Sequence, residues 1–93
     1  MTSNDVARPW RLVVEGLHRI AGHGLVAAGT MNATEEPKPG PITVWRPDGT
    51  TESRKARSFE RFAIPNWWHT NVGVLLDGDG DVPIGSVLEE VRQ

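Results

Sequence analysis

The chain has 93 residues, no cysteine and a formal net charge of −2 at pH 7. This length fits one small domain, and the lack of cysteine excludes disulfides and thiolate-bound metals. The acidic balance offers no general attraction to phosphate backbones, and no apolar run approaches the roughly 20 residues of a membrane-spanning helix.

Glycine and proline are spread along the chain and separate short apolar runs. This pattern favours an all-β fold over a helical bundle. Residues 1–8, which begin with a mostly polar stretch, are predicted to form a flexible arm, followed by a single domain over residues 9–93. The arm lacks the basic-then-apolar pattern of a secretion signal, so a cytoplasmic location is expected.

A first strand is predicted over roughly residues 10–19. Trp10, Leu12 and Val14 share one parity and are expected to face the core, while Gly16 marks a bulge or a bend. The run Gly22-His23-Gly24 then supplies a tight connection to the next antiparallel strand.

The second strand is predicted over residues 25–31, and it is apolar enough to be central in the sheet. Residues 32–41 contain three closely spaced prolines, which predict a stiff loop without ladder pairing. A short strand over 42–45 follows, and residues 46–50 carry the proline and glycine of a tight turn.

The most charged strand is predicted over residues 51–62. A helix is possible there on propensity alone, but the preceding turn favours a hairpin and therefore a strand. A loop over 63–70, a buried strand over 71–76, an acidic turn over 77–81 and a last strand over 86–91 complete the chain. About six strands with short connections predict a closed barrel rather than a sandwich, because closure removes exposed strand edges.

Several short motifs occur in the order and spacing of one known family. They are Pro9-Trp10 leading to Glu15, the run Ile20 to Gly29 with its glycines at 22, 24 and 29, Gly40-Pro41-Ile42-Thr43-Val44, Phe59 in the charged strand, Asn71-Val72-Gly73-Val74-Leu75-Leu76, and Gly85-Ser86-Val87-Leu88. In these motifs the chain resembles the second domain of elongation factor Tu and related translational GTPases. The resemblance implies a closed six-stranded antiparallel Greek-key β-barrel. The chain has no phosphate-binding Gly-x-x-x-x-Gly-Lys-Ser/Thr loop, so GTP hydrolysis by that family's mechanism is excluded.

In the family, this barrel helps to hold the aminoacylated end of tRNA. At the matching positions Glu15 and Asn71 are retained, whereas His23 replaces an arginine and Ala28 a threonine. Arg57 replaces a glutamate that packs on the terminal adenine, which reverses the charge and removes a hydrogen-bond acceptor. These differences argue against inherited binding of aminoacyl-tRNA.

A local basic cluster is formed by Arg54, Lys55, Arg57 and Arg61. One interpretation is a stripe that binds phosphates, with Phe59 stacking a base between Arg57 and Arg61. The other is a solvated face on which the cations pair with neighbouring glutamates.

Trp67 and Trp68 stand side by side in a predicted loop, and Trp68-His69 replaces the Ala-Gly of the family. An exposed tryptophan is a frequent anchor at protein interfaces. Equally, one ring can plug the end of the barrel while the other covers the surface beside it.

The sequence contains little that supports metal binding or catalysis. The acidic turn over 77–81 resembles the start of a calcium loop, but Val82 and Leu88 stand where the glycine and the bidentate glutamate are needed. The three histidines lack the spacing of a zinc site, and none lies near a credible nucleophile motif. We therefore expect no cofactor, no metal and no catalytic residue.

The sequence thus predicts a non-catalytic binding module that engages RNA or a protein of the translation apparatus. The residues expected to contact the partner are His23, Arg57, Phe59, Arg61, Trp67, Trp68 and Asn71. The alternative is a regulatory protein or oligomeric scaffold that reuses the barrel outside translation.

Overall fold

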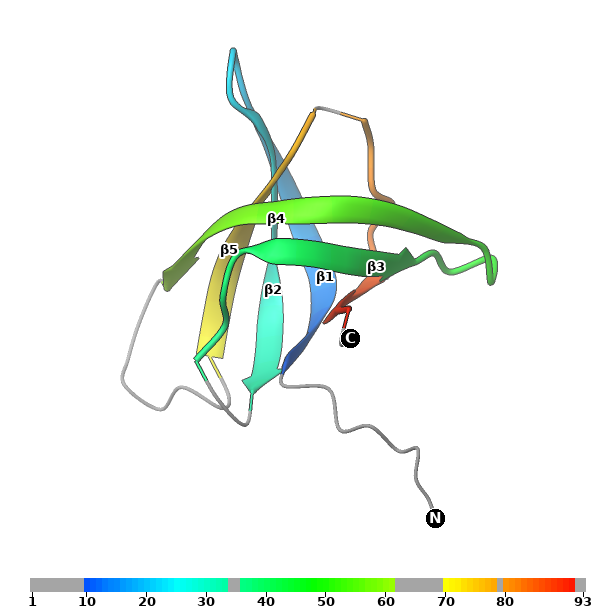
Figure 1. Ribbon diagram of the computed structural model, residues 1–93. Coiled ribbons are helices and arrows are strands. Elements are labelled where there is room, and N and C mark those ends of the chain that lie inside the picture. Colours follow the sequence, from blue (N-terminus) through cyan, green and yellow to red (C-terminus); the bar gives the residue numbers. More distant parts are fainter. Residues whose placement is uncertain (1–9, 34–35, 62–69, 79, 92–93) are drawn as a thin grey trace.

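The computed structural model describes residues 10–33, 36–61, 70–78 and 80–91 (Figure 1). Within these ranges, six antiparallel strands close into a barrel in the order β1-β2-β5-β4-β3-β6. Strands β3, β4 and β5 are consecutive neighbours, and β2 lies beside β5, which is a Greek-key order. The predicted closed six-stranded antiparallel barrel is confirmed. The strands are β1 (Trp10–Ile20), β2 (Gly24–Ala33), β3 (Gly40–Trp45), β4 (Thr51–Arg61), β5 (Thr70–Leu76) and β6 (Val87–Glu90).

Strand β1 contains the predicted bulge. Its pairing with β2 shifts between Val14 and Gly16, so Glu15 is the extra residue. Before the bulge, the predicted inward set is confirmed, because the side chains of Trp10, Leu12 and Val14 are fully buried. A bulge changes the phase of the residues that follow it, so the inner face of β1 is carried by different positions on either side of Glu15.

The core fills the barrel with side chains from all six strands and from the connection after β5. The rings of Phe59 and Trp10 pack in a T-shaped arrangement, with ring centroids 5.3 Å apart and an interplanar angle of 81°. Edge-to-face contacts of this kind are favoured by the aromatic quadrupole. The buried apolar residues are Trp10, Leu12, Val14, Leu25, Ala27, Met31, Ala33, Ile42, Val44, Ala56, Val72, Val74, Leu76, Val82 and Leu88.

The predicted loop over residues 32–41 is wrong at both ends. Strand β2 continues to Ala33, and β3 begins at Gly40, with Pro41 paired to Lys55 of β4. Proline is tolerated there because the Pro41 carbonyl accepts a hydrogen bond from Val91 N–H (3.1 Å) on the β6 side. The N–H and C=O of one residue point to the same side of an antiparallel strand, so the missing donor costs no bond to β4.

The other predicted boundaries differ by smaller amounts. The last strand is shorter than predicted, because Ser86 N–H turns back to the carbonyl of Pro83 (3.1 Å). The charged segment is a strand, as predicted, and it ends at Arg61. The predicted arm over residues 1–8 lies outside the described residues. Within the described ranges, no helix has the length and apolar character needed to cross a membrane.

The connection between β5 and β6 crosses one end of the barrel and is tied down by Arg54. Its guanidinium donates to the carbonyls of Asp77 (2.7 Å) and Gly80 (3.0 Å), and the side chain is only 7% exposed. Val82 in the same connection is fully buried. Arg54 therefore fastens this connection to the end of the barrel, because its guanidinium supplies hydrogen-bond donors to the carbonyls of the connection.

Candidate functional site

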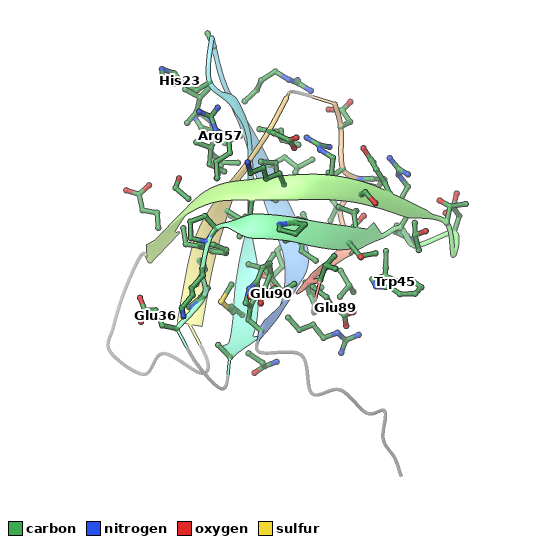
Figure 2. The ribbon with its side chains drawn as sticks, in the orientation of Figure 1. His23, Glu36, Trp45, Arg57, Glu89 and Glu90 are labelled. Atoms are coloured by element: carbon green, nitrogen blue, oxygen red, sulfur yellow. The ribbon has the colours of Figure 1, made fainter. Side chains whose placement is uncertain are left out.

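An open groove lies at one rim of the barrel, beneath the hairpin that joins β1 to β2. Its volume is about 370 Å³. Figure 1 shows this hairpin extending past β4, and Figure 2 shows Arg57 below His23 at the side of the hairpin. The lining contains two arginines and a histidine but no carboxylate, so the groove suits an anion. The lining residues are Arg19, Ile20, Ala21, Gly22, His23, Gly24, Arg57 and Gly78.

The hairpin turn is fixed by two glycines. His23 N–H donates to the carbonyl of Ile20 (2.9 Å), and Gly22 has φ 80°, as the third residue of such a turn requires. A Cβ on Gly24 would lie 2.5 Å from the carbonyl oxygen of Leu76 and 2.8 Å from that of Gly78. Because Gly24 has no Cβ, the hairpin passes closely over the end of β5, and Gly24 lines the groove.

Arg57 reaches the groove because β4 bulges at this residue. The pairing with β5 passes from Ala56 and Leu76 directly to Ser58 and Leu75, which leaves Arg57 as the extra residue. Bulges frequently re-aim a side chain in this way. The Arg57 Nη1 atom donates to the backbone carbonyl of His23 (3.3 Å), so β4 and the hairpin tip are linked across the groove.

The same bulge overturns the predicted placement of Phe59. Strict alternation puts Phe59 on one face with Arg57 and Arg61, where it can stack a base. In the structure Phe59 instead follows the inward phase of Ala56 and packs against the core and Trp10. A contribution of Phe59 to binding stays a prediction, but the ring does not lie on an outer basic stripe.

A second groove, of about 430 Å³, lies on the other side of Arg57 and is lined by Pro39, Lys55, Ala56, Arg57 and Asp77. Asp77 accepts a hydrogen bond from Lys55 N–H (3.0 Å) and lies 3.4 Å from Arg54 Nε. The backbone hydrogen bond from Lys55, more than the arginine, lowers the pKa of the Asp77 carboxyl. Arg57 therefore stands between two grooves.

The predicted basic cluster is divided by the fold. Arg54 closes the end of the barrel and pairs with Glu52 (3.5 Å), as the interpretation with glutamate partners expects. Lys55 and Arg57 are exposed and border the grooves. The phosphate-binding interpretation therefore stays a prediction for Lys55 and Arg57, which border the grooves, and for Arg61, of which only the backbone is described.

For two further predicted residues, Arg61 and Asn71, the structure describes the backbone alone. Arg61 pairs with Val72, and Asn71 pairs with Thr30, which locates their backbones in β4 and β5. Trp67 and Trp68 lie outside the described residues, so both interpretations of this pair stay predictions. Among the predicted contact residues, the structure brings together His23 and Arg57.

Sequence reasoning missed Arg19 as a groove residue. Arg19 pairs with the inward-facing Leu25, and its guanidinium forms an ion pair with Asp81. The bulge at Glu15 shifts the alternation of side chains in β1 and thereby sets the direction of Arg19. Gly16 is the residue in the sequence that indicates this bulge. The acidic turn is thus held by basic and backbone partners. The described residues contain no group of three or more histidine, aspartate or glutamate side chains arranged to hold a metal.

No protein-family model and no curated protein sequence matches this chain. The relation to elongation factor Tu therefore stands as a proposal that is based on the motifs alone.

Proposed function

We propose that this protein is a non-catalytic binding module that takes the phosphate groups of an RNA into the groove beside Arg57. The observation that carries the proposal is the composition of that groove, which combines His23 and Arg57 with backbone, includes no carboxylate in its lining, and also contains Arg19, whose guanidinium pairs with Asp81. A guanidinium has five N–H donors, and the bond to His23 uses one of them. The other donors match the geometry of phosphate oxygens.

The translation apparatus is the proposed setting. The ordered motifs that resemble the second domain of elongation factor Tu support this setting, as does the presence of Arg57 and His23 near the positions that serve tRNA in that family. Because Arg57 replaces an acceptor by a cation, the proposed ligand is an RNA backbone rather than the aminoacylated adenosine.

The test is the salt dependence of binding to a short fluorescein-labelled single-stranded RNA and to a deacylated tRNA, measured by anisotropy. Arg57→Ala is expected to weaken binding and to reduce the salt slope by about 1, because one phosphate contact is lost. Arg11→Ala is the matched control, since it removes the same charge from an exposed arginine that does not line the groove and pairs with Glu89. Equal affinities and equal slopes for the two variants contradict the proposal.

A second candidate is a regulatory or scaffold protein that uses the barrel outside translation. The observation that favours it is Trp45, a tryptophan that is 43% exposed on the outer surface of β3. A module of this kind binds its partner without RNA, so an absence of RNA binding in the test above favours this candidate.

A further inference from the structure

A row of apolar side chains crosses the outside of the barrel on the strands β1, β6 and β3. Val13 of β1 pairs with Val87 of β6, and Val87 pairs with Trp45 of β3. Val13 is 39% exposed and Trp45 43% exposed, while Val87 is half-buried between them. We call this row, together with the flanking Arg11 and Glu89, the Trp45 face.

The indole of Trp45 is held in place by the protein itself. Its Nε1–H donates to Glu89 Oε1 (3.1 Å), and the other oxygen of Glu89 lies 3.5 Å from Arg11 Nε. The polar atom of the ring therefore has its partner already, and what remains exposed is carbon surface. A partner that covers this surface buries apolar area without stripping water from an unpaired N–H, and the ordered ring loses little entropy.

The surroundings of this row carry more carboxylates than cations. Glu89 is balanced by Arg11, and Glu52 in the adjacent hairpin forms ion pairs with Arg46 and Arg54. The further acidic groups are Glu15, which accepts from the Thr30 hydroxyl, and Asp48, which accepts from Thr50. The hydrogen bond from the Thr50 hydroxyl lowers the pKa of Asp48, so this carboxyl is charged at neutral pH.

Figure 2 shows Trp45 and Glu89 on the side of the molecule away from His23 and Arg57. The Trp45 face is therefore separate from the basic groove and has the opposite excess of charge. A second copy of the chain would bring two acidic faces together, which electrostatic repulsion disfavours. The closed barrel also leaves no strand edge at this face for an added strand, so a partner must dock through side chains.

We propose that the Trp45 face docks a protein segment that presents an arginine or lysine beside an apolar side chain. The cation lies over the ring of Trp45 and close to the carboxylate of Glu89, while the apolar side chain covers Val13 and Val87. A cation over a tryptophan ring gains from the ring quadrupole, and the acidic surroundings add to the same preference.

The probe is the capped peptide Leu-Arg-Leu, compared with the capped peptide Leu-Gln-Leu. Binding is followed by the indole N–H signal of Trp45 in a nitrogen–proton correlation spectrum, which is assigned by its loss in Trp45→Phe. The arginine peptide is expected to shift this signal and the Val87 amide, with an affinity about fivefold higher than that of the glutamine peptide. Trp45→Leu, which keeps apolar bulk but removes the ring, is expected to erase this preference.

The variants alter an outward side chain, and unchanged amide signals of the buried strand residues establish that the barrel is intact. Equal binding of the two peptides overturns the proposal, as does a preference that survives in Trp45→Leu. A dimer in sedimentation experiments that dissociates in Trp45→Leu identifies the face as a contact between copies and also overturns it. A shift of the Trp45 indole by single-stranded RNA in place of the peptide does the same.

Discussion

Gly29 lies where two backbones leave no room for a side chain. It pairs with Val14 immediately before the bulge of β1, and a Cβ at this position would overlap the carbonyl oxygen of Val13. A backbone atom cannot rotate away as a flexible side chain can, so the strands must separate if the Cβ is added. The bulge and the glycine opposite it therefore depend on each other.

We expect Gly29→Ala to lower the free energy of unfolding by about 3 kcal/mol, the upper range for overpacking in a core. Gly16→Ala is the matched control, because a Cβ there meets nothing within 4 Å. Its effect should stay within about 0.5 kcal/mol. Urea unfolding followed by tryptophan fluorescence measures both variants, and similar losses for the two would contradict the close approach at Gly29.

The direction of the Arg57 side chain could not be predicted from the alternation of residues in the sequence. Its sequence neighbours alternate as a regular strand, and that alternation places Phe59 beside it on one face. The extra residue in β4 reverses the phase, so Phe59 turns to Trp10 and Arg57 turns to His23. No glycine or proline signals this bulge in the sequence, because its register is set by pairing with β5.

At the level of elements, both arginines of the groove are positioned by bulges. The bulge at Glu15 sets the phase of Arg19 in β1, and the bulge in β4 releases Arg57. The sequence predicted the first irregularity from Gly16 but not its consequence for Arg19. The groove thus results from two bulges that each interrupt the alternation of side chains along a strand. Analysis of each strand by itself does not show that the two arginines line one groove.

The β4 bulge is braced by Asp77, which follows β5. Its carboxylate accepts from Lys55 N–H, and its own N–H donates to the Lys55 carbonyl (3.0 Å). Because the pKa of Asp77 is lowered in the folded state, the charged carboxylate stabilises the protein above the ordinary pKa near 3.8. That contribution disappears as the pH falls through the lowered folded value.

We therefore expect Asp77→Asn to reduce the free energy of unfolding at pH 7 by less than about 1 kcal/mol, since half of the side chain is exposed and solvent screens it. The difference from the parent protein should shrink as the pH falls below about 4. Urea titrations across this pH range measure it, with Glu60→Gln as an exposed control on β4. A difference that stays constant down to pH 2 would show that charge on Asp77 does not brace the bulge.

For the molecule as a whole, the barrel was predictable because many weak signals agree. Turn residues separate six apolar runs. The prolines led only to wrong ends for the loop predicted over residues 32–41, since Pro41 needs no donor toward β4 and can belong to β3. The two surfaces were harder to predict, because each is assembled from strands that are distant in the sequence. Trp45, Val87 and Val13 meet only once β6 lies between β1 and β3.

Separation of the two surfaces leads to a last prediction about their independence. The basic groove depends on the β1–β2 hairpin and the β4 bulge, whereas the Trp45 face depends on β1, β6 and β3. Changes at distant sites without shared partners are usually additive. We expect Arg57→Ala to leave binding of the arginine peptide unchanged, and Trp45→Leu to leave the RNA affinity and its salt slope unchanged.

The double variant should then match Arg57→Ala in RNA affinity and Trp45→Leu in peptide affinity, each within about 0.5 kcal/mol of binding free energy. Anisotropy with labelled RNA, repeated at saturating arginine peptide, measures the same independence without any substitution. If the peptide changes the RNA affinity several-fold, the two surfaces are coupled through the barrel, and β1, which contributes residues to both, is the element that connects them.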